Sequence, residues 1–411
     1  MKDRQLKLRV SSRLILAAIT SLLLTGAQAR TWTSVDGAKT FEGELKTYDP
    51  ASGMVGVTLS NGKEMKFSQK VLSPADIAFL AEQGKVEAPT AGKSSAGKID
   101  ADPKNLFKPV DGKPADMSKP VQVFILLGQS NMVGAGKVAG LESAVKQEKK
   151  YPYLLNEAGN WAVRQDVRNV RVMFTGTLPW KQFNNEWMTV TGNTIGPEFG
   201  LGHALGNAID APVMILKSCI GNRALGWDLL PPNAEGYAGT GEIPRKPKAI
   251  TNPKTDWYAG LQYDGDVNAA QDVLADLKTY YPAAKKHEVA GFFFWQGEKD
   301  SGNAEWAAAY EKNLVLFIKA LRDDFKAPNA KFVLATLGED TEGCGNPVFD
   351  AHMAVDGKKG KYPEFKGNVA TVYSNPLSMG GSGNGHYGGN AETYMNVGEA
   401  MGQAMVELLK Q

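Results

Sequence analysis

The chain has 411 residues, of which 43% are hydrophobic and 22% are charged, a balance typical of folded globular proteins and not of disordered chains. Forty-six basic residues against 44 acidic ones leave a formal charge of +2, so no basic excess points to a nucleic-acid partner. At roughly 150 residues per domain, this length predicts one large domain with a companion, or two or three small domains.

The first 29 residues have the pattern of a secretory signal. Basic residues precede an apolar run, Leu14 to Leu24, and Ala27-Gln28-Ala29 supplies the small residues of a cleavage site. The run is well short of the roughly 20 residues that span a bilayer, and no later segment is long enough. We therefore expect cleavage after Ala29 and a secreted or periplasmic protein without a stable membrane span, with an uncleaved anchor as the alternative.

Residues 30–83 predict a small unit of short strands and one helix. The segments 40–47 and 54–59 are strand-like, and Asn61-Gly62 is a hairpin turn signal. In Leu72-Ser73-Pro74-Ala75-Asp76 the serine is a good N-cap, and the proline suits the first helical position. With the start at Arg30-Thr31-Trp32-Thr33, these features resemble the first Sla homology domain. The resemblance implies an SH3-like β-barrel that binds a protein or glycan, or acts as a spacer.

Residues 84–104 are rich in Gly, Lys, Ala and Ser and lack an apolar period, as is typical of a flexible linker. We place this linker at 84–119, because the composition changes near Pro120 and the large domain then occupies residues 120–411.

Apolar segments alternate with amphipathic ones throughout the large domain. Five apolar segments predict buried strands, at 121–127, 213–216, 289–295, 332–335 and 369–372. Helical patterns lie at 198–209, 267–280, 304–323 and 391–409. This alternation predicts an α/β fold, in which a parallel sheet of about five strands lies between two helical layers. In such sheets the functional site lies at the carboxyl ends of the strands.

The first strand ends in Gly128-Gln129-Ser130-Asn131-Met132. A serine on a sharp strand-to-helix turn projects its hydroxyl from the sheet edge, close to backbone N–H groups that can hold an oxyanion. Met132 excludes the Gly-x-Ser-x-Gly elbow of many lipases, and Ala139 breaks the spacing of a dinucleotide loop. A purely structural turn is the remaining alternative.

Two more strands end in glycine beside polar groups. The second strand runs into Lys217-Ser218-Cys219-Ile220-Gly221-Asn222, and the third into Trp295-Gln296-Gly297-Glu298. The Gly221 N–H and the Gln296 amide are candidate oxyanion donors, and ordinary turn chemistry explains either residue equally well.

A serine nucleophile needs a base, and the chain has four histidines. We expect His203 on a solvated helix face, His287 at the amino end of the third strand, and His352 in a short helix. His386 lies in a glycine-rich loop, 380–389, between the fifth strand and the last helix. This loop is at the carboxyl ends of the strands, so we predict that His386 is the base.

Residues 120–410 resemble the sialate O-acetylesterase domain, a carbohydrate-esterase branch of the SGNH hydrolases. The motifs that carry the resemblance are the Ser130 block, Ile195-Gly196-Pro197-Glu198-Phe199-Gly200, Trp295-Gln296-Gly297-Glu298 and His386-Tyr387. The resemblance implies a flavodoxin-like SGNH fold with Ser130 as nucleophile and His386 as base. It also implies that the Ser130 and Gly221 amides and Gln296 hold the oxyanion.

The implied activity is hydrolysis of acetyl esters on carbohydrates through an acetyl-serine, without a metal or organic cofactor. Sialic acid, xylan and other acetylated polysaccharides all fit. We add four neighbouring residues as candidates for substrate binding: Gln129, Asn131, Asn222 and Arg223. Tryptophans in predicted loops are candidate sugar platforms, with packing at the domain rim as the alternative: Trp180, Trp187, Trp227 and Trp257.

One departure from the family pattern weighs against catalysis. Many relatives have an aspartate three residues before the histidine, and Gly383 stands there instead. The candidate acids are Glu298, Asp300 and Glu392, of which we favour Glu298, and a loop carbonyl or Asn384 is the alternative. The missing aspartate favours a second hypothesis, a carbohydrate-binding protein that has lost the triad acid. A third hypothesis is an esterase or lipase acting on other acyl esters.

The cysteines allow one disulfide. Cys219 and Cys344 can pair in an exported protein, and two buried free thiols are the alternative. Two cysteines and four scattered histidines give no zinc-ligand spacing, so we expect no metal site.

Overall fold

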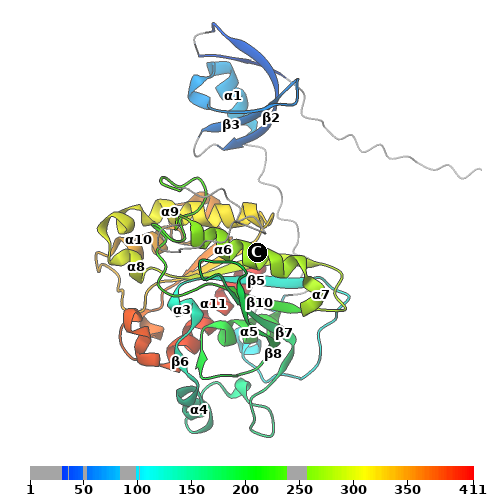
Figure 1. The fold of residues 1–411 in the computed structure, drawn as a ribbon, viewed down its shortest axis with the longest axis vertical. Helices are drawn as coiled ribbons and strands as arrows, with labels where there is room; N and C mark the ends of the chain where they lie inside the picture. The colour runs from blue at the N-terminus through cyan, green and yellow to red at the C-terminus, as the bar shows by residue number, and fades with distance from the viewer. Residues whose placement is uncertain (1–29, 36, 50–52, 84–98, 101, 238–256) are drawn as a thin grey trace, which may run out of the picture. The chain divides into compact units, whose positions relative to one another are not determined.

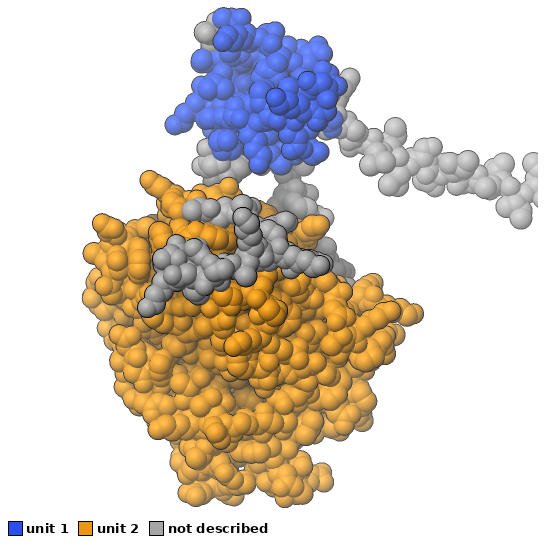
Figure 2. Space-filling model, viewed as in Figure 1, with its two compact units in different colours: residues 1–90 blue, residues 91–411 orange. Residues whose placement is uncertain are grey.

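The computed structural model describes residues 30–35, 37–49, 53–83, 99–100, 102–237 and 257–411. The chain divides into two compact units, residues 1–90 and 91–411 (Figure 2). The predicted secretory signal, residues 1–29, lies outside the described residues. Among the described helices, none has the length and apolar character needed to cross a membrane.

The small unit is a four-stranded antiparallel sheet with one helix. Each strand pairs with the next along the chain: β1 Arg30–Thr33, β2 Thr40–Asp49, β3 Met54–Leu59 and β4 Glu64–Ser68. A 3-10 turn, Gln69–Val71, leads to α1, Pro74–Gln83. Trp32, Val55, Val57, Leu72 and Leu80 form its buried core. Closure of this sheet into an SH3-like barrel stays a prediction.

The start of α1 ties the helix to the sheet. The Asp76 N–H donates to Ser73 Oγ at 3.3 Å, as the N-cap pattern predicts. The Asp76 carboxylate accepts hydrogen bonds from the Thr33 N–H at 2.9 Å and from Arg30 at 2.5 Å. The same short motif therefore starts the helix and fastens it to β1.

The large unit contains a seven-stranded sheet in the order β13-β12-β11-β5-β10-β7-β8 within the described residues (Figure 1). Its strands are β5 Val121–Gly128, β7 Arg164–Met173, β8 Lys181–Met188, β10 Val213–Ser218, β11 His287–Trp295, β12 Lys331–Ala335 and β13 Val369–Val372. All neighbours are parallel except β7 and β8, which are antiparallel. The mostly parallel α/β sheet is confirmed.

The expected number of about five strands is too low, because β7 and β8 were missed. All five predicted strands are present, and the two missed strands pair with each other at one edge of the sheet. In β7, Arg164, Arg168 and Arg171 interrupt the apolar residues, so the segment lacks the continuous apolar run expected of a buried parallel strand.

Two helical layers cover the sheet. Phe124 and Leu126 of β5 belong to the core shared with α4, α5 and α11. Val123 and Ile125 of the same strand belong to the core shared with α6, α9 and α10. Because successive side chains point to opposite faces, a strand buried on both faces must be apolar throughout. This is why the β5 sequence has no polar alternation.

The remaining elements surround this sheet. The helices are α2 Pro103–Leu106, α3 Ser130–Val133, α4 Val138–Lys146, α5 Glu198–Ala208, α6 Leu261–Ala275, α7 Leu277–Tyr280, α8 Glu298–Ser301, α9 Ala304–Asp324, α10 Pro347–Ala354 and α11 Ala391–Leu409. A two-stranded ribbon pairs β6 Gly136–Lys137 with β9 Thr194–Ile195. Short 3-10 segments span Pro152–Leu154, Pro363–Phe365, Asn375–Leu377 and Gly383–Gly389.

The described part of the expected linker packs on the large unit. Ile99 forms a bridge with Ile209, and Asn207 Nδ2 donates to the Leu106 carbonyl of α2 at 2.9 Å. Lys119 pairs with Asp210 at 2.7 Å. These contacts lead the chain into β5 at the middle of the sheet.

The strand order brings three predicted motifs together. β5 lies between β11 and β10, although these three strands are far apart in sequence. Because the three strands are parallel, their carboxyl ends lie together at the same side of the sheet. Strands that come later in the chain extend from β5 in both directions, and ligands bind sheets of this kind at such a point. Ser130, Gly221 and Gln296 each follow one of these ends.

Candidate active site

The turn that carries Ser130 depends on a glycine. Gly128 ends β5 with φ +139°, and a Cβ placed there would lie 2.3 Å from the Trp295 carbonyl oxygen. The next N–H, of Gln129, donates to that same carbonyl at 3.2 Å. Ser130 then begins α3 and remains partly exposed. The absence of a side chain at 128 is what allows β5 to turn against β11 at this point.

Gly221 lies against Ser130. A Cβ placed on Gly221 would be 3.4 Å from Ser130 Cβ and 3.9 Å from the Ser130 backbone nitrogen. No hydrogen bond among the described residues uses the N–H of Ser130 or Gly221. Two free backbone donors beside a serine hydroxyl are the arrangement that an oxyanion requires.

Asp300 holds the loop that carries Gly221. Its carboxylate accepts hydrogen bonds from the Leu225 N–H at 2.9 Å and from the Gly226 N–H at 2.7 Å. Burial raises the pKa of Asp300 to about 6. Asp300, one of the candidates for the triad acid, therefore positions the loop that carries Gly221.

The Gln296 side chain is buried and fully hydrogen-bonded. Its Nε2 donates to Asp300 Oδ2 at 2.6 Å and to the Arg223 carbonyl at 2.9 Å, and its Oε1 accepts from the Tyr310 hydroxyl at 2.7 Å. Both amide hydrogens thus have partners. The side chain links α8 to the Gly221 loop, and it would hold an oxyanion only by giving up one of these bonds.

Glu298 lies between the two amides that flank Ser130. Gln129 Nε2 donates to Glu298 Oε2, and Asn131 Nδ2 donates to Glu298 Oε1. All three side chains are buried, and burial raises the pKa of Glu298 to about 8. Gln129 and Asn131, which we expected to bind substrate, therefore link the turn that carries Ser130 to Glu298. Asn222 is exposed and Arg223 is partly exposed.

His386 lies on a strained loop. His386 and Tyr387 have φ of +52° and +53°, the left-handed region that non-glycine residues seldom occupy. The buried Tyr387 ring stacks on Trp295 with centroids 5.8 Å apart. Its hydroxyl accepts from the Gly338 N–H at 3.1 Å and from Asn131 Nδ2 at 3.4 Å. These contacts tie the histidine loop to the residues beside Ser130.

The described residues contain no hydrogen bond from the His386 imidazole to Ser130, to Glu298 or to another carboxylate. Hydrogen bonds of catalytic groups often tighten only when substrate binds, so this geometry does not remove His386 as a base. Glu392, another candidate acid, pairs instead with Lys150 at 2.6 Å.

A buried ion pair that contacts α3, the helix that begins at Ser130, was not predicted from the sequence. Lys217 Nζ donates to Glu198 Oε2 at 2.6 Å and to the Val133 carbonyl of α3 at 2.9 Å. Glu198 Oε1 accepts from the Gly196 N–H at 3.1 Å. A lysine at the end of an otherwise apolar strand was the sequence signal for this pair, since a buried lysine needs a partner.

Among the described residues, none of the other three histidines forms a hydrogen bond with Ser130. The expectation of a solvated His203 is wrong, because it is buried with its ring 4.8 Å from that of Tyr153. His352 is buried and lies 3.1 Å from the Tyr310 hydroxyl, and burial lowers its pKa to about 3. His287 begins β11 at the amino end, as predicted.

Both cysteines are free. Of the two possibilities left open by the sequence, the structure has no disulfide between Cys219 and Cys344; Cys219 is buried, as the second possibility requires, and Cys344 is exposed. Among the described residues, no group of three or more His, Cys, Asp or Glu side chains is arranged to hold a metal ion.

The four tryptophans have different surroundings. Trp180 donates to Asp272 at 3.0 Å, and Trp187 packs on Tyr281, so both belong to the domain rim. The Trp257 ring lies 4.9 Å from the Arg223 guanidinium. Trp227 is 43% exposed, on the loop that follows Gly221. Of the four tryptophans, Trp227 is therefore the exposed one that lies nearest to Gly221 in the sequence.

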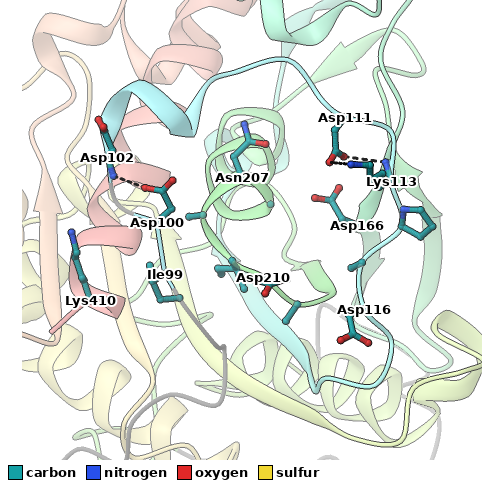
Figure 3. Close-up of a pocket in the computed structure, with 16 residues that line it drawn as sticks. Ile99, Asp100, Asp102, Asp111, Lys113, Asp116, Asp166, Asn207, Asp210 and Lys410 are labelled. Carbon is teal, nitrogen blue, oxygen red and sulfur yellow. Dashed lines mark hydrogen bonds and ion pairs between the residues drawn. The ribbon is translucent and has the colours of Figure 1, made fainter.

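A cavity of about 1000 Å³ lies near the amino ends of β7 and β10, whereas Ser130 follows the carboxyl end of β5 (Figure 3). Asp166 at the start of β7 and Asp210 before β10 line it, together with Asp100, Asp102, Asp111 and Asp116. No serine or histidine lines this cavity. It therefore lacks the serine and histidine that the predicted chemistry uses, and the region around Ser130 remains the candidate active site.

Comparison with known families agrees with the motifs. Residues 256–407 match the family model described as carbohydrate esterase, sialic acid-specific acetylesterase. This confirms, over that segment, the family recognised from the sequence. The segment contains Gln296, Glu298 and His386, and Ser130 precedes it. No curated protein matches the chain.

Solved structures give weaker likenesses. A protein from Arabidopsis thaliana has 18% identity and a TM-score of 0.41, over 70% of this chain and 98% of its own. A carbohydrate acetylesterase from Xanthomonas citri has 13% identity and a TM-score of 0.43, over 91% of this chain and 67% of its own. NanS has 15% identity and a TM-score of 0.39, over 66% of this chain and 80% of its own.

Proposed function

We propose that this protein is a serine esterase that removes O-acetyl groups from carbohydrates. The observation that carries the proposal is the contact between Ser130 and Gly221, whose free N–H groups lie beside a partly exposed hydroxyl. The family match over 256–407 supports the carbohydrate-esterase class.

In the proposed reaction His386 takes the proton from Ser130 Oγ, and the oxygen attacks the acetyl carbonyl carbon. The N–H groups of Ser130 and Gly221 hold the resulting oxyanion. His386 then gives the proton to the sugar oxygen as the C–O bond breaks, leaving acetyl-serine. Water attacks that ester as His386 takes its proton, and His386 then returns the proton to Ser130 Oγ as the ester C–O bond breaks and acetate leaves. None of these steps uses a metal or organic cofactor.

Gln296 has a different part in this scheme from the one the family pattern implies. Because both of its amide hydrogens have partners, we assign it to holding the Gly221 loop through Arg223 and Asp300. The two backbone N–H groups are then the principal oxyanion donors.

The substrate is proposed to be an acetylated sugar. Exposed Trp227 offers a flat apolar face beyond the oxyanion loop, which suits stacking on a sugar ring. Asn222 and Arg223, on the same loop, offer polar contacts to ring substituents. We also propose that residues 1–29 direct export and are removed, and that the small unit is a binding or spacer module.

The test compares release of nitrophenol from 4-nitrophenyl acetate by the chain from residue 30 and by the Ser130→Ala and His386→Ala variants. We expect a loss of at least about 10³-fold in both variants, since each removes a group needed for nucleophilic attack. Ser143→Ala and His287→Ala are the matched controls, because both residues lie away from the Ser130 edge.

A second candidate is a carbohydrate-binding protein without catalysis. The lack of a hydrogen bond between His386 and a carboxylate in the described residues favours it. An inert parent with intact fold, together with measurable affinity for acetylated glycans, would support this reading. Faster hydrolysis of octanoyl than of acetyl esters would instead point to an esterase of long acyl chains.

A further inference from the structure

We propose that Glu339 supplies the carboxylate that orients the His386 imidazole, in place of the aspartate that position 383 lacks. This inference rests on the proposed serine-esterase function. It assigns a positioning role to a residue that neither the motifs nor the family match singles out.

The first observation is where the Glu339 carboxylate lies. Glu339 Oε2 accepts a hydrogen bond from the Gly383 N–H at 2.8 Å. A Cβ placed on Gly383 would be 2.8 Å from that same oxygen and 2.7 Å from Glu298 Oε1. An aspartate at 383 would place its own carboxylate in the space next to that Cβ. Glutamate oxygens from other segments therefore border the position that the missing side chain would take.

The second observation is how the turn that carries Glu339 is fastened to the histidine loop. Glu339 follows β12, and its neighbour Gly338 donates its N–H to the Tyr387 hydroxyl at 3.1 Å. Asn375 Nδ2 donates to the Gly338 carbonyl at 2.8 Å. The two segments are thus joined by hydrogen bonds at Gly383 and at Tyr387, on either side of His386.

Packing at Gly338 leaves this turn little freedom. A Cβ on Gly338 would lie 2.2 Å from Ser378 Oγ and 2.6 Å from the Tyr387 ring. The turn can lie this close to Tyr387 only because residue 338 has no side chain. The turn that carries Glu339 is therefore fixed in position against the segment that contains His386.

The third observation separates Glu339 from Glu298. Both Glu298 oxygens accept amide hydrogens, from Gln129 and Asn131, and the group is buried. Glu339 is exposed, and its second oxygen, Oε1, has no hydrogen-bond partner among the described residues. Of these two carboxylates, only Glu339 has an oxygen that accepts no hydrogen bond among the described residues, and this oxygen can accept an imidazole N–H.

The proposed role of Glu339 follows from its negative charge. When Ser130 gives its proton to His386, an imidazolium forms, and a nearby carboxylate stabilises it and holds the ring in the productive tautomer. Glu339 would do this from the turn after β12, as an aspartate at 383 would from the histidine loop itself.

The test measures kcat and KM for 4-nitrophenyl acetate in Glu339→Gln, with Glu342→Gln as the matched control on the same loop. Glu342 is also an exposed glutamate. We expect Glu339→Gln to lower kcat by about 10²- to 10⁴-fold with KM within about threefold, because the residue does not touch substrate. Glu342→Gln should keep the parent values.

A relocation experiment gives a readout that a purely structural role would not move. We expect Glu339→Ala to be impaired and Glu339→Ala with Gly383→Asp to recover at least about tenfold in kcat, because the acid then stands where relatives have it. Removing the Glu339 side chain also frees space beside position 383. Circular dichroism and melting temperature establish that each variant is folded.

Two results would overturn the assignment: an unchanged kcat in Glu339→Gln, or a folded relocation variant no faster than Glu339→Ala. Failure of the proposed function looks different, because the parent would then be no faster than Ser130→Ala. A parent whose activity depends on Ser130 thus makes either result a judgement on Glu339 alone.

Discussion

Replacing Lys217 by methionine should destabilise the large unit more than any substitution in an exposed ion pair. The Lys217 side chain is 2% exposed, and its Nζ lies 2.6 Å from Glu198 Oε2 and 2.9 Å from the Val133 carbonyl oxygen. Methionine keeps the apolar stem and removes the charge. Glu198, which is also buried, would then be a carboxylate without its cation.

The expected cost is about 3–5 kcal/mol, because removing one partner leaves an uncompensated buried charge. Removing both partners, as Lys217→Met with Glu198→Met, leaves no buried charge. Lys217→Met alone already deprives the Val133 carbonyl of its partner, so the double variant adds only the loss of the partner of the Gly196 N–H, at about 1–3 kcal/mol. This loss is smaller than the cost of the uncompensated carboxylate that the double variant removes. We therefore expect the double variant to be more stable than Lys217→Met alone.

The measurement is urea unfolding followed by tryptophan fluorescence, with the midpoint and slope fitted for each variant. Lys146→Met is the control, because Lys146 and Glu142 form an exposed pair on α4. It should cost no more than about 0.5 kcal/mol. The reasoning fails if Lys217→Met costs as little as Lys146→Met, or if the double variant is as unstable as the single one.

Gly128→Ala should lower both melting temperature and kcat, because a Cβ at φ +139° would lie 2.3 Å from the Trp295 carbonyl oxygen; parent-like kinetics would contradict this. His352→Gln should flatten the fall in stability on acidification. Burial lowers the His352 pKa from its usual 6.5 to about 3, so its contribution is complete above pH 6.5 and is lost as the pH falls. The slope is about 1.4 kcal/mol per pH unit between pH 6 and 4, measurable by urea unfolding at pH 7, 5 and 4, and equal slopes in parent and variant would refute it. Tyr387→Phe should cost about 1–3 kcal/mol and lower kcat, because the Gly338 N–H loses its acceptor; thermal melts and 4-nitrophenyl acetate kinetics measure both, and an unchanged protein would show that this bond is unimportant.

Local patterns in the sequence were sufficient for the main elements. The five apolar strands and the helix 391–409 are present where their periodicity placed them. The Ser73 cap and the turn at Gly62, with φ +79°, follow from the preferences of single residues. These features depend on side-chain spacing and backbone conformation within a few residues, so a sequence displays them directly.

The two adjacent polar strands on the β8 side of the sheet were harder to predict. β7 and β8 are partly exposed and rich in polar residues, and they pair with each other at the sheet edge. Their strand character comes from pairing, since the packing environment decides β-propensity more than the residues themselves. His203 was misplaced for a related reason, because only the packing of α5 against the Tyr153 segment buries it.

The sequence by itself determined the order of five of the seven strands and of the main helices, the turn that exposes Ser130, and the placement of His386 after the last strand. The tertiary structure alone decided which distant groups meet. Glu298 lies 169 residues from Gln129, and Glu339 lies 44 residues from Gly383, yet each pair shares a hydrogen bond. Such contacts follow from strand order and loop packing, which bring together residues whose spacing along the chain carries no period. The sequence therefore showed that an acid was missing at 383, and the fold showed which carboxylates lie beside that position.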